Sequence, residues 1–350
     1  MYKILTLSSS SEWKYYFFLL PEDRQDIYYT PEYYELYEKN GDGKAQCFVF
    51  EKDDEIALYP FLINSVNSLG YNLGKQYYDI QGAYGYNGVA SSSDNKAFIE
   101  AFSSAFQEYS QETNIISEFT RFNPIIKNHF FSRFLEIIYD RDNVFVNLNL
   151  DDFEKESYKY STQKNIKKAK RNLLSCVAFK GTEVNKSTLL DFIDIYYLTL
   201  DRNIAEKYYY FSLNFFESIF SNLAKNCTLY FVSYQGKYIS TELVLHGKKI
   251  AYSFLGGTLS ENFDLRPNDL LKDYIIKDLK YKELKIFCLG GGSDGVLKYK
   301  MTFARNGVIP FYIGKKVYNQ VIYDEVINQW ELKFPEKKVQ FNNRILKYRY

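Results

Sequence analysis

One order of strand-like and helix-like segments occurs twice along this chain. A β-hairpin is expected at residues 45–63 and a second one about 180 residues later at 228–245, with strands and helices alternating around both. Two copies of a mixed α/β unit explain the repeat, and 350 residues are too many for one comfortable core. The sequence therefore predicts an N-terminal domain at 1–150 and a C-terminal domain at 151–350, which begins with a basic linking helix at 153–172.

The second copy is the clearer one. Its expected elements around the hairpin are helices at 187–201, 212–225, 268–281 and 295–305 and strands at 249–257, 284–289 and 308–313. In the first half, apolar residues at helical spacing predict a helix at 94–112 with Asp94 as its N-cap. Short strands are expected after it, near 115–120 and 143–150.

Charge and composition limit the classes of ligand. Lys and Arg (44) nearly balance Asp and Glu (43), so no global basic field is available for nucleic acid and any anion site must be local. The cysteines lie far apart and two histidines cannot form a multi-histidine cluster, so we expect no metal site. The sequence has neither a run of about 18 apolar residues nor a convincing signal peptide, and we expect a cytoplasmic protein without a transmembrane segment.

Three consecutive glycines form the strongest local motif. Gly290, Gly291 and Gly292 follow the strand-like KIFCL, where a backbone without side chains lets a ligand approach closely. The helix expected from Gly295 offers its N-terminal amides to an anion. The spacing fits neither a Walker A loop nor a dinucleotide fingerprint. A plain strand-to-helix turn explains the same residues and stays open.

A second glycine motif precedes another expected helix. Gly256 and Gly257 end a strand, and Arg266, Asn268 and Asp269 surround the entry to the helix that follows. A helix N-terminus beside a strand end is a natural cradle for a pyrophosphate, so we assign these residues and the glycine triplet to cofactor binding. An ordinary helix capped by Asn268 or Asp269 is the alternative.

A third loop alternates glycines with tyrosines. Tyr84, Tyr86 and Asn87 lie within GAYGYNG at 82–88 and combine flat rings with hydrogen-bonding groups. Such residues suit a sugar or a base, because stacking area and hydroxyls come together. A surface loop without a ligand is the alternative.

Four cations share one face of the basic helix. Lys164, Lys167, Lys168 and Arg171 are spaced i, i+3, i+4 and i+7. Because the rest of the chain is nearly neutral, this stripe could hold a phosphate group of a substrate. A solvated charged face is the other explanation of the same pattern.

Three of these blocks resemble one family. LGGGSDGVLKYKMTF (289–303) resembles the LGGG…FKxxF block of FemAB-like acyltransferases, tandem-GNAT enzymes that include peptidoglycan-bridge aminoacyltransferases. KNIKKAKR (164–171) is similar to their basic N-I-R-K-A helix, and DIQGAYGYNG (79–88) to a segment of relatives in surface-polysaccharide biosynthesis. The resemblance implies an α/β fold of two GNAT-like domains. Each would be a mixed twisted sheet with helices on both faces, with a cleft between or beside the domains for donor and acceptor.

Two positions depart from the family pattern. Lys167 stands where the basic helix usually has arginine, and Tyr299 stands at the aromatic position before Lys300, which is the matching lysine. The resemblance thereby implies a substrate-binding role for Lys300, and Lys298 and Arg202 are further cationic candidates.

The implied activity is N-acyl transfer from acyl-CoA to the amine of a nucleotide-linked (dTDP- or UDP-) amino sugar in surface-polysaccharide biosynthesis. GNAT folds stabilise the oxyanion with backbone N–H groups where two strands splay, here the strands that end at Gly256 and Leu289. Asp294, Tyr252 and Asp79 are candidates to take the proton of the amine. An aminoacyl-tRNA-dependent transferase of the peptidoglycan-bridge type and a non-catalytic binding module on the same fold are the alternatives.

Overall fold

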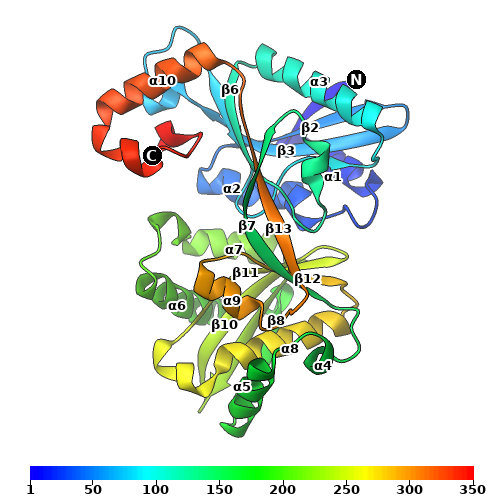
Figure 1. Cartoon of the computed structure of the whole chain (residues 1–350), viewed down its shortest axis with the longest axis vertical. Helices are drawn as coiled ribbons and strands as arrows, with labels where there is room; N and C mark the ends of the chain where they lie inside the picture. Colours follow the sequence, from blue (N-terminus) through cyan, green and yellow to red (C-terminus); the bar gives the residue numbers. More distant parts are fainter. The chain divides into compact units, whose positions relative to one another are not determined.

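The computed structural model describes all 350 residues and divides them into two compact units (Figure 1). Unit 1 comprises Met1–Asp140 and Phe311–Tyr350, and unit 2 comprises Arg141–Pro310. The sequence predicted one crossing after residue 150, whereas the chain returns to unit 1 for its last segment. A return of this kind leaves no mark in hydrophobic periodicity, which reports elements and not their partners.

Unit 1 contains a mixed sheet in the order β1-β2-β3-β4-β6-β13, with the short β5 beside β3. Its strands are β1 (Tyr2–Thr6), β2 (Lys44–Lys52), β3 (Glu55–Ser65), β4 (Tyr78–Gln81), β5 (Ala90–Ser91), β6 (Ile115–Arg121) and most of β13 (Val308–Val317). Neighbours run antiparallel except β4 and β6, which are parallel.

Unit 2 contains a sheet of the same design, in the order β8-β9-β10-β11-β12-β7. Its strands are most of β7 (Glu136–Asn147), β8 (Ser175–Lys180), β9 (Cys227–Tyr234), β10 (Lys237–His246), β11 (Ile250–Thr258) and β12 (Ile286–Gly290). All neighbours are antiparallel except β11 and β12. Each sheet thus has three antiparallel pairs, one parallel pair and a final antiparallel strand, which confirms the internal repeat.

Helices cover both faces of the sheet in unit 1. On one face, α3 (Lys96–Glu112) buries Phe102 and Phe106 against Phe48 of β2. On the other face lie α1 (Ser10–Leu19), α2 (Pro31–Asn40) and α10 (Gln320–Lys333), which α11 (Lys338–Phe341) follows. The N-cap of α3 is Asn95, whose side chain accepts from the amide of Ala97, and not the predicted Asp94.

In unit 2, α8 (Pro267–Tyr281) packs on one face of the sheet, where its Ile275 and Leu279 share a core with Val232 and Val244. The other face carries α6 (Lys186–Arg202) and α7 (Leu213–Asn222). Helix α9 (Asp294–Lys300) follows β12 and is shorter than predicted. The expected helices and strands of this half are otherwise present.

The predicted basic helix at 153–172 is two helices, both within unit 2. Helix α4 (Phe153–Glu156) ends before Tyr158, whose buried hydroxyl donates to Asp273 of α8. The backbone amide of Lys159 then donates to the carbonyl of Thr302, and α5 (Tyr160–Arg171) begins. The chain therefore turns inward between the helices, and α5 packs against α8.

A buried carboxyl in unit 1 gives a pH-dependent stability. Glu118 of β6 accepts hydrogen bonds from the hydroxyls of Tyr59, Thr120 and Tyr318, and burial raises its pKa to about 7. The folded state therefore holds this proton more tightly than the unfolded chain. Its contribution to stability, at most about 3 kcal/mol, is present at low pH and is lost as pH rises from about 4.5 through 7.

Replacing Glu118 with glutamine should flatten this pH dependence, because the amide does not ionise. Urea unfolding of the wild type and Glu118→Gln between pH 4 and 8 measures the difference. The exposed Glu112→Gln is the matched control and should keep the wild-type slope. Equal slopes for the wild type and Glu118→Gln would show that Glu118 titrates as an ordinary carboxyl.

Candidate active site

The parallel strands of unit 2 part after a short pairing. β11 and β12 pair only from Ile250 to Tyr252 and from Ile286 to Cys288. Beyond this point β11 continues beside β10 and β12 beside β7. The pairing of β11 with β10 shifts register here, between Leu243 and Val244 of β10, which is a β-bulge of the kind found beside active sites. The strands that part are the two predicted from the sequence, and their facing backbone edges are left without a strand partner.

A buried ion pair lies on the α8 face of these strands. Lys272 of α8 donates to both carboxylate oxygens of Glu242 on β10, at 2.6 and 2.5 Å, and to the hydroxyl of Ser253 on β11 at 3.3 Å. The two charged side chains are only 8% and 10% exposed. Buried charges of this kind are expensive unless paired, and they are frequent at functional sites.

A second lysine carries a perturbed charge next to this pair. The ammonium of Lys300 donates to the carbonyl of Gly291 at 2.5 Å, directly after β12. Burial, and then repulsion by Lys272, lower the pKa of Lys300 to about 8. The hydroxyl of the preceding Tyr299 is buried and has no hydrogen-bond partner. Burial and the charges of Asp269 and Glu242 raise the pKa of Tyr299.

The entry of α8 differs from the predicted capped helix. Arg266, exposed and at φ 65°, occupies the N-cap position, and no side chain caps the helix. Asn268 lies inside the first turn, where its carbonyl oxygen accepts from the hydroxyls of Ser240 and Thr258. Asp269 is buried, accepts from the side chain of Asn165 at 3.2 Å, and has a pKa raised by burial. The first amides of α8 are therefore free of side-chain caps.

Contacts and backbone geometry within unit 2 explain why glycine occupies the positions of the two glycine motifs. A Cβ at Gly256 would lie 2.6 Å from the carbonyl oxygen of Thr241, and one at Gly257 would meet Thr199 of α6. Gly290 and Gly292 have φ of 72° and 147°, where other residues are strained. Close packing and turn geometry thus account for these glycines without a ligand, and their role in cofactor binding stays a prediction.

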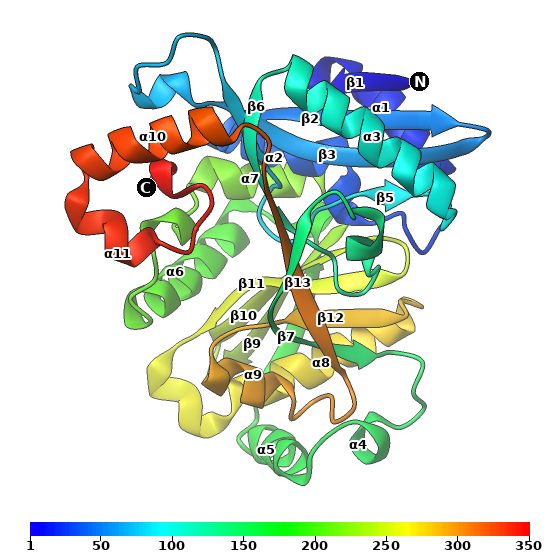
Figure 2. The ribbon, with the colours of Figure 1, turned by 45° about the horizontal axis from the view of Figure 1, so that its top comes forward.

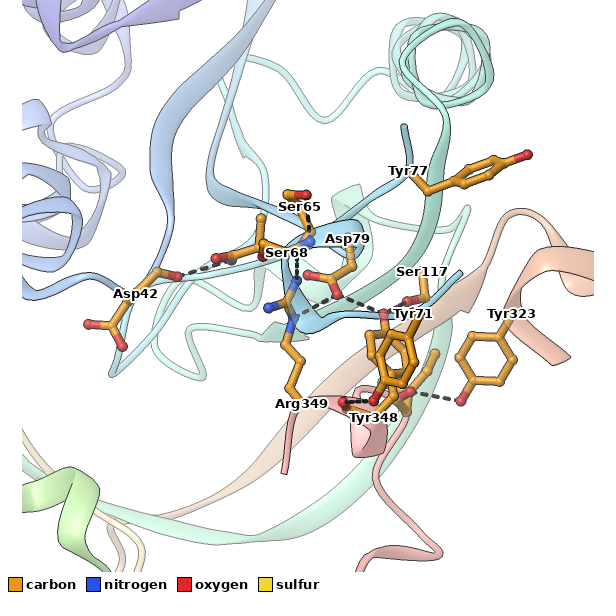
Figure 3. A network of polar contacts seen from close by, with 12 residues as sticks. Asp42, Ser65, Ser68, Tyr71, Tyr77, Asp79, Ser117, Tyr323, Tyr348 and Arg349 are labelled. Atoms are coloured by element: carbon orange, nitrogen blue, oxygen red, sulfur yellow. Dashed lines mark hydrogen bonds and ion pairs between the residues drawn. The ribbon is translucent and has the colours of Figure 1, made fainter. Parts of the chain in front are cut away.

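The three proton acceptors predicted from the sequence lie outside this polar cluster. Tyr252 is buried within β11, and Asp294 is exposed in the first turn of α9. Asp79 belongs to unit 1, where its carboxylate accepts from the hydroxyl of Tyr348 and the guanidinium of Arg349, each at 2.7 Å (Figure 3). Figure 3 shows that Tyr348 and Arg349, both from the C-terminal segment, form hydrogen bonds with this carboxylate. Burial, despite Arg349, raises the pKa of Asp79.

The tyrosine-rich loop lies in unit 1 and is held from within. Asn87 is buried, donates to the carbonyl of Ala83 at 2.6 Å and accepts from the amide of Arg121 at 2.9 Å. Tyr84 and Tyr86 are half-buried, and the ring of Tyr86 contacts Phe311 edge-on. Asn87 therefore shapes the loop, while the two tyrosines keep partly exposed surfaces.

The remaining predicted cations are distributed over unit 2. Lys164, Lys167 and Lys168 are exposed on α5, and Lys298 is exposed on α9. Arg202 donates to the carbonyl of Thr258 at 2.7 Å and lies over the ring of Phe263. Among the predicted substrate-binding cations, only Lys300 is part of the buried cluster.

Glu242 and Lys272 were not predicted from the sequence, although a signal was present. Glu242 occupies an inward position of the apolar strand STELVL. Lys272 precedes Ile275, Ile276 and Leu279 by three, four and seven residues, so it lies on the core face of its helix. A lone charge on the core face of an element indicates a buried polar site.

Comparison with known families finds a match within unit 2. Residues 160–301 match the model described as an acetyltransferase (GNAT) domain. The matched residues contain the parting strands, the buried ion pair and Lys300. Comparison with the curated proteins gives no significant match.

Solved structures extend the likeness to both units of the chain. A FemX structure is similar over 93% of this chain and 99% of its own, with a TM-score of 0.66 and 12% identity. A tandem GNAT protein from clavulanic acid biosynthesis covers 91% of this chain and 98% of its own, with a TM-score of 0.52 and 7% identity. The C-terminal domain of a putative lysylphosphatidylglycerol synthetase from Agrobacterium fabrum covers 94% and 96%, at a TM-score of 0.54 and 10% identity.

These similarities confirm the predicted fold, a tandem of GNAT-like units with mixed twisted sheets. At such low identities they carry the fold alone. No helix of the chain has the combination of length and apolar character that crossing a bilayer requires. The match to an acetyltransferase (GNAT) domain supports an acyltransferase activity. It does not identify the acyl group or the acceptor.

Proposed function

We propose that this chain moves an acyl group from acyl-CoA to the amine of a nucleotide-linked amino sugar (dTDP- or UDP-) in surface-polysaccharide biosynthesis, in the cytoplasm. The observation that carries the proposal is the opening between β11 and β12 in the GNAT domain, with the ammonium of Lys300 at its edge. It provides the backbone donors and the positive charge that acyl transfer needs.

The donor side of the proposal fits the described residues. Acyl-CoA brings two amides in an extended chain and a pyrophosphate. The open edge of β11 offers backbone partners to the amides, and the uncapped first turn of α8 suits the pyrophosphate. Exposed Arg266 adds a positive charge at this turn. The likeness to GNAT acetyltransferases supports acyl-CoA as the donor.

The chemical step requires no metal or covalent intermediate. The amine nitrogen attacks the thioester carbonyl, a C–N bond forms, the C–S bond breaks, and coenzyme A leaves as a thiol with the proton that the amine loses. Negative charge develops first on the carbonyl oxygen and then on the sulfur. Lys300, with a pKa of about 8, stabilises this charge while it is an ammonium. Its hydrogen bond to Gly291 holds it in place.

The acceptor side rests on residues whose side chains are partly or fully exposed. Tyr84 and Tyr86 are half-buried, so each keeps some accessible surface for a sugar or a base, and exposed Lys298 offers a charge to a phosphate. Asn87 and Arg202 use their polar groups within the chain, so they contribute through the shape of their surroundings.

Replacing Asn268 with aspartate tests the pyrophosphate position. Aspartate still accepts from Ser240 and Thr258, but it adds a negative charge to the first turn of α8. We expect binding of acetyl-CoA to weaken about three- to fivefold. Calorimetry with acetyl-CoA measures this, and Asn149→Asp, the same change at an exposed position of unit 2, should leave it unchanged. If all three proteins bound acetyl-CoA with equal affinity, the pyrophosphate would not bind at the entry of α8.

One alternative keeps a specific observation in its favour. A transferase that takes its acyl group from aminoacyl-tRNA would use the exposed cations of α5 for the phosphates of the RNA. The similarity of fold to FemX is in agreement with this alternative. Transfer that requires tRNA and fails with acyl-CoA would establish it.

A further inference from the structure

The outer face of α5 carries an unusual concentration of charge. Thr162, Ile166 and Ala169 are buried against unit 2 and fix the rotation of the helix. At 100° per residue, the side chains that lie opposite this buried face are those of Tyr160, Lys164, Lys167 and Arg171. Lys168 and Lys170 flank them, and all six residues are exposed. Figure 2 shows α5 beside α4 at the edge of unit 2.

The five cations of this face, the four lysines and Arg171, form no ion pair with an acidic residue of the chain. Several other lysines of unit 2 form ion pairs, such as Lys155 with Asp152 at 2.9 Å and Lys282 with Asp278 at 2.7 Å. On a molecule with a net charge of +1, five uncompensated charges on one short helix create a local positive field. The face therefore suits an extended anionic partner.

Two exposed apolar side chains lie at the two ends of α5. Tyr160 is 78% exposed at the start of α5, and Leu173 is 85% exposed just after its end. Leu173 comes thirteen positions after Tyr160, which corresponds to roughly 20 Å at the rise of a helix. Leu173 also has φ of 58°, a conformation that is unfavourable for a leucine. Both side chains therefore present apolar surface to the solvent.

We propose that α5 docks the protein on an anionic membrane surface. Lipid phosphates would neutralise the five cations, Leu173 would enter the boundary of the acyl chains, and Tyr160 would lie at the headgroups. A helix face directed away from its own core is convex, which suits a surface better than a small phosphorylated molecule. An RNA strand would use the cations but offers no apolar environment to a leucine. The apolar ends thus favour lipid over RNA.

Vesicle co-sedimentation of the full chain tests the proposal without acyl transfer. The probes are phosphatidylcholine vesicles with and without phosphatidylglycerol. We expect binding only with phosphatidylglycerol, and it should weaken with added salt. A variant with Lys164, Lys167, Lys168 and Arg171 all changed to glutamine should bind at least about a hundredfold more weakly. The charge-matched control changes the exposed Lys52, Lys75, Lys207 and Lys225 to glutamine and should bind as the wild type does.

Two further arms separate lipid from the other phosphate sources. Tyr160→Ser with Leu173→Ser keeps every charge and should weaken vesicle binding about tenfold, because apolar insertion is lost. Equal loss in the charge-matched control would overturn the proposal, since net charge alone would then bind the vesicles. It would also be overturned if millimolar UDP displaced the vesicles, or if tRNA bound more tightly than vesicles and insensitively to the serine changes.

Discussion

Replacing Lys300 with glutamine should lower kcat for acyl transfer about 10²- to 10³-fold, which is the usual effect of removing one group that stabilises an oxyanion. KM for the donor should change much less, because the charge that Lys300 stabilises develops only in the transition state. Lys225→Gln, an exposed change in the same unit, should retain wild-type kinetics. If Lys300→Gln raised KM alone, Lys300 would bind the substrate and not the transition state.

The pH profile separates the roles that Lys300 can have. With its pKa lowered to about 8, Lys300 loses its charge above that pH, so kcat should fall on the alkaline side with an apparent pKa near 8. Lys300→Arg should lose this alkaline limb, because a guanidinium stays protonated. A rate that rises through pH 8 in the wild type would mean that the neutral amine acts as a base, contrary to the proposed step.

Breaking the Glu242–Lys272 pair should cause the largest loss of stability. Lys272→Met leaves the carboxylate of Glu242 buried without its partner, which costs about 3–5 kcal/mol. Changing Glu242 to leucine as well removes both charges, and the double variant should recover most of this loss. Denaturant unfolding of both single variants and the double variant measures the coupling between the two residues.

A second ion pair, at the C-terminal end of α8, provides the matched control. Lys282 and Asp278 are 2.7 Å apart, but their side chains are 28% and 22% exposed. Lys282→Met should therefore cost only about 1 kcal/mol or less. If Lys272→Met cost no more than Lys282→Met, water would reach the Glu242–Lys272 pair and the site would be open. Lys272→Met should also shift the alkaline limb of Lys300 upward, because repulsion by Lys272 is part of the cause of its low pKa.

The sequence predicted most elements because apolar periodicity is a local property. Phe98, Phe102 and Phe106 mark the buried stripe of α3, and the apolar runs LYFVSY and ISTELVL on either side of a Gly-containing turn mark the hairpin of β9 and β10. What lies beyond local pattern was missed. The pairing of β13 with β6 joins segments almost two hundred residues apart, and no periodicity reports it. The break between α4 and α5 depends on Tyr158 reaching Asp273, which is a tertiary contact.

The site was predicted in part for the same reason. The glycine triplet, Lys300 and the two strands that part were visible as motifs, and the structure brings Lys300 to the end of β12. Glu242 and Lys272 come from different elements, so their pairing follows only from the fold. Asp79 was a candidate to take the proton of the amine, whereas in unit 1 its carboxylate accepts from the C-terminal Arg349.

Mass spectrometry of the product tests the central claim most directly. The purified chain would be incubated with isotope-labelled acetyl-CoA and a panel of UDP- and dTDP-linked amino sugars, in the absence of tRNA. The account predicts one amino sugar that gains the labelled acyl group in place of one hydrogen, with an equal amount of free coenzyme A thiol, and loss of both in Lys300→Gln. A labelled product that forms only when aminoacyl-tRNA replaces acyl-CoA would contradict it.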